Sequence, residues 1–364
     1  MKYIFEDVLE IKNGKNQKAV ENSEGKYPIY GSGGVMGYAD DYICDSDTVI
    51  IGRKGSINNP IYVTERFWNV DTAFGLSAKR ELLLPRYLFY FCKKFNFEKL
   101  NKTVTIPSLT KSDLLKIKID LPAIPKQQEV VERLSKIETV INVRRQELSA
   151  LDELIKARFV EMFGTLHDNE NGYDVATIED VCLLIKDGTH QTPQYTGDKE
   201  AGYKFLSSKD VMSQKIDWSD IKYIPTELHE KLYATIRPQR NDILMSKNGV
   251  NYGVAAVNDT DEVFDIYVSL ALLRPKELID PVFLRCVINN PETKRQFDSS
   301  IKGIGVPNLH LGEIKKTRIF LPPMELQKEF VAFVHQVDKS KSVVQKALDE
   351  TQMLFDSLMQ EYFG

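Results

Sequence analysis

Residues 106–131, IPSLTKSDLLKIKIDLPAIPKQQEVV, return 200 positions later as residues 306–331, VPNLHLGEIKKTRIFLPPMELQKEFV. The two stretches align without a gap, and the offset continues to the C-terminus, where EMFG ends at Gly164 and EYFG at Gly364. Identical positions are Pro107 and Pro307, Leu109 and Leu309, Ile119 and Ile319, Leu121 and Leu321, Pro122 and Pro322, Gln127 and Gln327, and Glu129 and Glu329. A repeat of this length predicts one structural unit that occurs twice.

The similarity extends upstream, with gaps. The matching segments are FEDVLEIKNG (5–14) and IEDVCLLIKDG (178–188), DTVIIGRKG (47–55) and NDILMSKNG (241–249), and LLPRYLFYF (83–91) and LIDPVFLRCV (278–287). Short apolar runs broken by Gly, Asn and Asp, such as NPIYV, DTVII, DILMS and YGVAAV, predict β-strands. Each copy is therefore expected to be a β-rich segment followed by a helix.

The helix prediction rests on apolar residues at alternating spacings of four and three after the prolines near residues 122–125. The first series is Val130, Leu134, Ile137, Ile141, Leu148, Leu151, Ile155 and Met162, interrupted by Arg144 and Arg158. The second is Phe330, Val334, Val337, Val344, Leu348, Phe355, Leu358 and Tyr362, interrupted by Lys341 and Thr351. This spacing predicts a coiled-coil seam. An ordinary amphipathic helix packed on a core is the alternative.

The order of these elements predicts their geometry. The second β-rich unit begins soon after the first helix ends and also precedes the second helix, so paired helices must be antiparallel. At a rise of 1.5 Å per residue, a helix of roughly 37 residues is about 55 Å long, a length comparable to one or more turns of DNA. We expect an α+β fold with two pseudo-symmetric β-rich domains, 1–121 and 164–321 (with a linker at 164–177), and two spacer helices, 122–163 and 322–364.

Composition excludes several classes of protein. With 364 residues, of which 42% are hydrophobic and 27% charged, the chain can bury a sizeable core in about two or three domains. It has neither a long apolar run nor a signal-like start, which predicts a cytoplasmic protein. The four cysteines form no CxxC pair and the five histidines no HExxH, so no disulfide framework or metal site is expected. The net charge of −4 means that nucleic-acid binding would depend on local basic patches.

A glycine-rich segment, YPIYGSGGVMGY at 27–38, resembles a nucleotide-binding loop at first sight. A dinucleotide fingerprint needs glycine at its first, third and sixth positions, and counting from Gly31 the sixth position is Met36. No Gly-Lys-Ser/Thr follows either, which excludes a P-loop. A surface loop that approaches another molecule closely, or a plain β-hairpin turn, are the two remaining interpretations.

The combination of IYGSGGVMGY, IIGRKG, the repeated proline-flanked stretch and two long helices resembles the specificity (S, HsdS) subunits of type I restriction-modification systems. The resemblance covers nearly the whole chain. It implies a non-enzymatic protein whose two target recognition domains each read half of a bipartite double-stranded DNA sequence. It also implies that two methyltransferase subunits dock on the helices and methylate adenine at N6 with S-adenosylmethionine, and that a nuclease and translocase subunit uses ATP and Mg. No cofactor is expected on this chain.

The sequence agrees with a non-catalytic chain. An amino-methyltransferase needs an Asp/Asn-Pro-Pro-aromatic loop, and both NPIY (59–62) and DPVF (280–283) lack the second proline. The second is better explained as a helix start, because proline is favoured in the first helical turn. A protein-bridging scaffold without DNA binding and a catalytic methyltransferase are the alternatives.

Polar and basic residues in the turn-rich segments are the candidate DNA contacts, since Arg, Asn and Gln pair with base edges and Lys with phosphate. In the first unit they are Ser32, Gly33, Gly34, Arg53, Lys54, Ser56, Asn58, Lys102, Thr103 and Ser108. In the second they are Lys186, Thr189, His190, Gln191, Tyr195, Lys247, Asn248, Asn251, Tyr252, Lys302 and Asn308. Solvated loop residues without a partner are the alternative at each position. The two sets differ, which predicts an asymmetric target.

Overall fold

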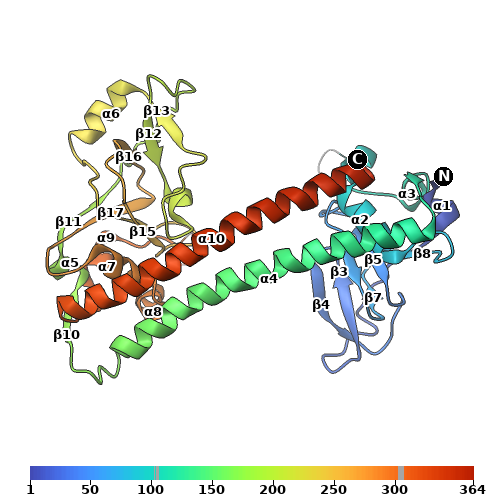
Figure 1. Ribbon diagram of the computed structural model, residues 1–364, viewed down its shortest axis with the longest axis horizontal. Coiled ribbons are helices and arrows are strands. Elements are labelled where there is room, and N and C mark those ends of the chain that lie inside the picture. The colour runs from blue at the N-terminus through green and yellow to red at the C-terminus, as the bar shows by residue number, and fades with distance from the viewer. Residues whose placement is uncertain (102, 104–105, 302–306) are drawn as a thin grey trace. The chain divides into compact units, whose positions relative to one another are not determined.

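The computed structural model describes residues 1–101, 103, 106–301 and 307–364 (Figure 1). The chain divides into two compact units, Met1–Glu147 with Val344–Gly364, and Leu148–Val343. Both long helices, α4 (Ile124–Phe163) and α10 (Met324–Phe363), pass from one unit into the other, so each unit contains a half of each helix.

The first unit holds a pair of strands and two small sheets. The pair is β1 (Lys2–Ile4) with β9 (Lys118–Asp120). The antiparallel four-stranded sheet has the order β2 (Leu9–Asn13), β8 (Ala73–Ala78), β5 (Thr48–Gly52), β6 (Ile61–Val63). The three-stranded sheet has the order β4 (Gly34–Ala39), β3 (Tyr27–Gly31), β7 (Trp68–Asn69). Short helices complete the unit: α1 (Phe5–Val8), α2 (Pro85–Lys94), η1 (Phe97–Leu100) and α3 (Lys111–Leu115).

The second unit repeats this topology. The pair is β10 (Asp174–Thr177) with β18 (Arg318–Leu321), and the four-stranded sheet runs β11 (Cys182–Asp187), β17 (Leu270–Pro275), β14 (Ile243–Ser246), β15 (Ala255–Val257). The three-stranded sheet runs β13 (Lys222–Ile224), β12 (Tyr203–Leu206), β16 (Phe264–Ile266). Equivalent helices are α5 (Ile178–Val181), α7 (Pro281–Ile288) and α9 (Leu311–Lys316), while η2 (Ser208–Val211), α6 (Thr226–Tyr233) and α8 (Pro291–Ser300) enlarge this unit. The two-copy prediction is confirmed.

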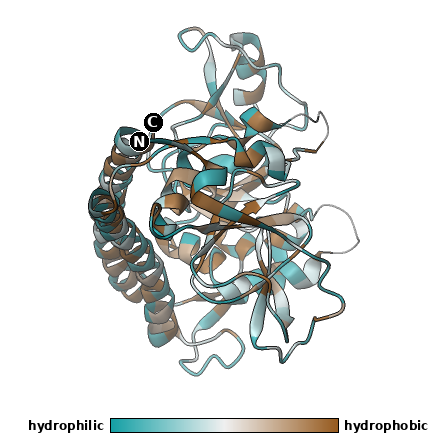
Figure 2. Cartoon of the chain, turned by 90° about the vertical axis from the view of Figure 1, so that its right-hand side faces the viewer, coloured by the Kyte–Doolittle hydropathy of each residue, from teal (hydrophilic) through white to brown (hydrophobic). Residues whose placement is uncertain are grey.

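The strands form where the sequence predicts, because their apolar residues are buried. β5 is buried along its whole length, and so is its counterpart β14, as expected for central strands covered on both faces. DPVF is a helix start, as predicted: the Asp280 side chain accepts hydrogen bonds from the N–H groups of Val282 and Phe283, with Pro281 at the first helical position. Figure 2 shows brown, hydrophobic segments interleaved with teal along both long helices, which is the pattern of partly buried helices.

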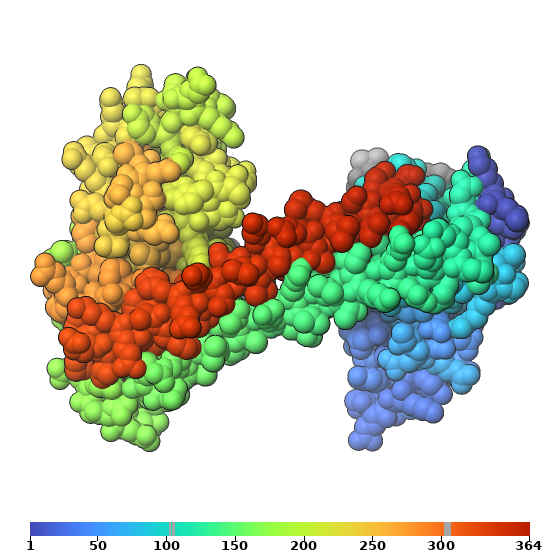
Figure 3. Space-filling model, viewed as in Figure 1, coloured from blue at the N-terminus to red at the C-terminus, as the bar shows by residue number. Residues whose placement is uncertain are grey.

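Within each unit the halves of α4 and α10 pack side by side (Figure 3), and their contacts show that they run antiparallel. In the first unit Arg133 contacts Tyr362 and Arg144 contacts Thr351, and in the second Arg158 contacts Glu329. Residues later in α4 thus contact residues earlier in α10. The two helices are therefore antiparallel, as predicted.

The predicted seam is largely confirmed. Its buried members are Val130, Leu134, Ile141, Phe330, Val334, Val337, Leu348 and Phe355, and the remaining predicted residues are half-buried. The sequence prediction missed Phe159, Phe163 and Met359, which are also buried. Polar residues that interrupt the apolar seam have partners on the other helix. The Arg144 guanidinium donates to the carbonyl of Ala347 and the hydroxyl of Thr351, and Lys341 forms an ion pair with Asp152.

A buried glutamine fastens the start of each long helix to its unit. The side chain of Gln127 accepts a hydrogen bond from the N–H of Leu84 (2.9 Å) and donates to the carbonyls of Leu82 and Pro122 (2.8 and 2.9 Å). Gln327 repeats the arrangement with the N–H of Asp280 (2.8 Å) and the carbonyls of Leu278 and Pro322. The identity of these glutamines in the repeat therefore has a structural cause.

Replacing Gln127 with Met is expected to lower the free energy of unfolding by about 2–3 kcal/mol, because the partly buried backbone groups of Leu82, Leu84 and Pro122 lose their partner. Urea unfolding measures the change. The exposed neighbour Gln128 provides the control, Gln128→Met. Equal losses in the two variants would contradict a special role for Gln127.

Candidate nucleic-acid interface

Two of the predicted loops of the first unit lie together. Ser32 and Gly33 form the turn between β3 and β4, which is the hairpin interpretation of the glycine-rich segment. A side chain on Gly52 at the end of β5 would come within 3.0 Å of the Ser32 Cβ and 2.3 Å of the Ser56 carbonyl oxygen. Gly52 is therefore needed for the turn and the loop after β5 to approach one another, and the two segments form one polar surface.

The loop after β5 is held by main-chain hydrogen bonds that recur in the second unit. The N–H of Gly55 donates to the carbonyl of Pro107 (3.0 Å), and the N–H of Leu109 donates to the carbonyl of Arg53 (2.9 Å). In the second unit Gly249 donates to Pro307 (3.0 Å) and Leu309 to Lys247 (2.8 Å). Gly55 and Gly249 both have a left-handed backbone, with φ of 78° and 84°, which favours glycine.

We call these paired segments the platforms: residues 53–55 with 107–109 in the first unit, and 247–249 with 307–309 in the second. Each brings together loop residues that the sequence analysis predicted separately. Lys54 bridges to Ser108, and Asn248 bridges to Asn308 at the equivalent place. Lys102 and Lys302, which were predicted nearby, lie outside the described residues.

The first platform presents free side chains. Arg53, Lys54 and Ser56 are exposed, and the Arg53 guanidinium stands 5.8 Å from the ring centre of Phe74. Asn58 is also exposed, but its side chain already accepts from the N–H of Phe97 (2.7 Å). Among the residues of this surface that the structure describes, Arg53 and Lys54 are thus the exposed cations accessible to an external anion.

Asn101, which the sequence analysis missed, organises the edge of the first platform. Its side-chain oxygen accepts from the N–H groups of Thr103 (3.0 Å) and Ser108 (3.1 Å). Thr103 is exposed and Ser108 is half-buried. The turn-forming tendency of Asn is the signal that could have found it.

The second platform differs in its charge. The Lys247 ammonium lies 2.6 Å from a carboxylate oxygen of Asp187, and the lysine side chain is only 5% exposed. The other carboxylate oxygen lies 3.6 Å from Nε2 of His190, which is exposed. The structure therefore brings His190 and Lys247 together through Asp187, an acid that the sequence analysis missed, and leaves Lys247 neutralised instead of free.

The rest of the second platform combines exposed and packed residues. Asn251 and Asn308 are exposed and Asn248 is half-buried. Tyr252 is buried, its hydroxyl donates to Asp298, and the Lys294 ammonium lies 3.8 Å from the ring centre. Tyr252 thus packs against α8 in this structure.

The segment after β11 supplies the remaining predicted residues. Thr189 and Gln191 line a cavity of about 350 Å³ together with Asp187 and residues of α6. Lys186 is exposed, and its ammonium lies 3.4 Å from the carbonyl of Thr235. Tyr195 is exposed on the same segment, where its ring lies 4.3 Å from the ammonium of Lys222; partial burial raises the pKa of the Tyr195 hydroxyl. The loop therefore forms a polar surface with one aromatic side chain.

Among the residues that the structure describes, no group of three or more His, Cys, Asp or Glu side chains is arranged to hold a metal ion. In the same part of the chain, none of the helices combines the length and the apolar character needed to cross a bilayer.

Comparison with known proteins identifies relatives over most of the chain. A family model described as "Type I restriction modification DNA specificity domain" matches residues 2–153 and 170–350. The type I restriction enzyme MjaVIII specificity subunit of Methanocaldococcus jannaschii is 22% identical over 333 residues, covering 84% of this chain and 77% of the relative. The EcoBI specificity subunit of Escherichia coli is 21% identical, covering 87% of this chain and 73% of the relative.

Solved structures share the fold. The crystal structure of the type I restriction-modification S subunit from M. genitalium covers all of this chain and 96% of that one, with a TM-score of 0.61 and 16% sequence identity. A second structure, described as showing complex assembly and conformational transition of a type I system, has a TM-score of 0.53 and 16% identity, and covers all of this chain and 97% of its own.

Proposed function

Because the chain belongs to the family of type I restriction-modification DNA specificity subunits, we propose that its two β-rich domains each read one half of a split DNA target. The specificity subunit is the non-catalytic member of such a system. The observation that supports the proposal is the pair of platforms, which share their main-chain hydrogen bonds and differ in their side chains. Arg53 and Lys54 stand where Lys247 and Asn248 stand in the second copy, so unlike half-sites and an asymmetric target are expected.

The catalytic chemistry belongs to partner subunits in this proposal. A methyltransferase bound to this chain transfers the methyl group of S-adenosylmethionine to N6 of adenine within the target. A nuclease and translocase subunit that uses ATP and Mg completes the restriction complex. The chain's own part is to select the site, through phosphate contacts that fix its position and side chains that read base edges.

The long helices offer two equivalent apolar surfaces for the methyltransferases. Val143 and Val343, 200 residues apart, are 53% and 65% exposed, and Leu154 and Leu354, with the same offset, are 46% and 51% exposed. Contact of Arg145 with Gln352 places Val143 level with Leu354, and contact of Lys341 with Asp152 places Leu154 level with Val343. The helix halves of each unit thus expose a valine and a leucine at equivalent positions of the repeat, with Val140 and Met353 exposed in the first unit and Val160 in the second, which supports one docked subunit per unit.

Co-expression of this chain with the methyltransferase of its system, followed by mapping of N6-methyladenine across the host DNA, tests the proposal. A split, asymmetric motif that is methylated only when this chain is present is the expected result. If the partner is bound and active and no motif appears, the recognition role is wrong and a bridging scaffold becomes the better explanation.

A further inference from the structure

Three acidic positions recur in both long helices at the 200-residue offset, and one of them, 138 and 338, forms ion pairs with the recognition domain of its own unit. Glu138 of α4 and Asp338 of α10 are 200 residues apart, and their side chains are 19% and 17% exposed. Neither residue stands out in the sequence, because a charged residue on a long helix usually faces solvent. Their burial calls for partners.

In the first unit Glu138 binds three side chains of α2. The Arg86 guanidinium donates to it at 2.7 Å, the Tyr90 hydroxyl at 3.0 Å and the Lys93 ammonium at 3.1 Å. Burial raises the pKa of Glu138, but Lys93, Tyr90 and Arg86 together hold it below its ordinary value, so the carboxylate is charged at neutral pH. Arg86 is itself confined, with Tyr62 and Phe89 within 4.8 and 5.3 Å of its guanidinium.

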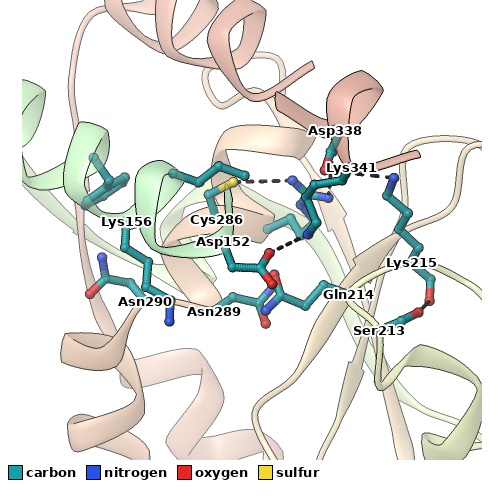
Figure 4. A pocket seen from close by; sticks show the side chains of 13 residues that line it. Asp152, Lys156, Ser213, Gln214, Lys215, Cys286, Asn289, Asn290, Asp338 and Lys341 are labelled. Carbon is teal, nitrogen blue, oxygen red and sulfur yellow. Dashed lines mark hydrogen bonds and ion pairs between the residues drawn. The ribbon is translucent and has the colours of Figure 1, made fainter. Parts of the chain in front are cut away.

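In the second unit Asp338 faces cations from two places. The Arg285 guanidinium of α7 lies 3.6 Å from one carboxylate oxygen, and the Lys215 ammonium, from the segment after η2, lies 3.8 Å from the other. Arg285 is buried. Figure 4 shows Asp338 with Lys215 beside it, and Lys341 directed at Asp152.

The cations have changed position between the copies while the acid has not. In the alignment of LLPRYLFYF with LIDPVFLRCV, Arg86 corresponds to Val282 and Tyr90 to Cys286, whereas Arg285 corresponds to Phe89. The ionic link is therefore rebuilt from other residues of α7. Packing alone would not require a carboxylate at the same place twice.

A hollow lies beside the acid in each unit. Its volume is about 560 Å³ in the first unit and about 40 Å³ in the second. Equivalent residues line both hollows: Glu138 and Asp338, Ile141 and Lys341, Gln352 and Asp152. In the first unit, where side chains leave the larger space, the angle between the helix and its neighbour depends on the directional polar contacts that remain. In the second unit the hollow has room for only a few water molecules, so the polar contacts act there together with close packing.

We propose that Glu138 and Asp338 are positioning residues that fix the angle of each recognition domain on the long helices. This inference depends on the proposed function, since it assigns the link a role in site selection. A domain held at one angle accepts its half-site at one displacement along the DNA. Loss of the charge lets the domain tilt, so that targets with another spacer between the half-sites become acceptable.

The test uses the full chain co-expressed with its methyltransferase and plasmids that carry the target with its native spacer or with one base pair more or less. In Glu138→Gln and in Asp338→Asn, the preference for the native spacer is expected to fall about tenfold, which corresponds to about 1.4 kcal/mol. Glu138→Asp and Asp338→Glu keep the negative charge and are expected to retain much of the preference for the native spacer. Glu147→Gln and Glu350→Gln, at exposed positions of the same helices, are the matched controls.

A purely structural role would give a different result: a lower melting temperature and equal loss of methylation at all spacers, which would overturn the inference. Unchanged spacer preference in both variants would also overturn it. Should Glu138→Gln fail to fold, Lys93→Met removes one exposed partner of the same link and is expected to give a smaller shift in the same direction. If the unmodified chain directs no methylation in this assay, the proposed function itself fails.

Discussion

A chain with Leu154 and Leu354 both replaced by Glu is expected to co-purify with no methyltransferase, whereas either single replacement is expected to retain one. Both leucines are about half exposed on the long helices at equivalent positions of the repeat. Burying a leucine side chain contributes about 1.5–3 kcal/mol to binding, and burying a carboxylate in its place costs additional free energy. A loss of affinity of at least about thirtyfold per site is therefore expected.

Size-exclusion chromatography with light scattering of the co-expressed complexes measures the number of bound subunits. Gln146→Glu and Gln360→Glu introduce the same charge at exposed polar positions of the two helices and should leave two methyltransferases bound. Retention of both subunits by the double variant would place the docking surface elsewhere.

Removing the equivalent cations Arg53 and Lys247 of the two platforms is expected to have different effects, the first on DNA binding and the second on stability. Arg53→Ala should change the free energy of unfolding by less than about 0.5 kcal/mol, because Arg53 is exposed. It should weaken specific DNA binding of the assembled complex about 5- to 150-fold, the range for one base-reading arginine. Lys247→Met should instead lower the free energy of unfolding by about 2–4 kcal/mol, because it leaves Asp187 largely buried without its counter-ion.

Urea unfolding measures the effect of each variant on stability. Fluorescence anisotropy, with a DNA duplex that carries the motif identified by methylation mapping, measures its effect on DNA binding. Adding Asp187→Asn to Lys247→Met removes the uncompensated charge and is expected to recover most of the lost stability. Destabilisation by Arg53→Ala, or a stable Lys247→Met variant, would contradict the assignment of one free and one paired cation.

The repeated topology could be predicted from sequence because the two copies support each other. A single stretch such as DTVII or DILMS is ambiguous between a strand and a buried helical turn, yet both occur at the same place in the repeat and become β5 and β14. The helix direction followed from connectivity alone. The seam was predicted less completely, since Phe159 and Phe163 face the recognition domain around Phe283 as well as the other helix.

The candidate site could be predicted only in outline. Lys247 looks like a free cation in SKNGVNY, and only the fold shows that Asp187, 60 residues earlier, neutralises it. Glu138 and Asp338 each look like ordinary surface acids, because Arg86 and Arg285 lie on helices about 50 residues away and Lys215 lies still farther along the chain. A matching acid at an offset of 200 does not by itself reveal them, because Glu129 with Glu329 and Glu161 with Glu361 match in the same way at more exposed positions. Which loop residues touch bases stays a prediction.

The platforms also bear on how such a chain can evolve. Their inter-segment hydrogen bonds join main-chain N–H and carbonyl groups, which every residue except proline supplies in full. Substitutions at positions 53, 54 and 56 therefore leave those bonds in place while they alter the chemistry offered to the outside. Under the proposed function, a lineage that carries this fold acquires new target sequences through point changes at these positions that cost little stability, and selection acts on the new target before any compensating change is needed.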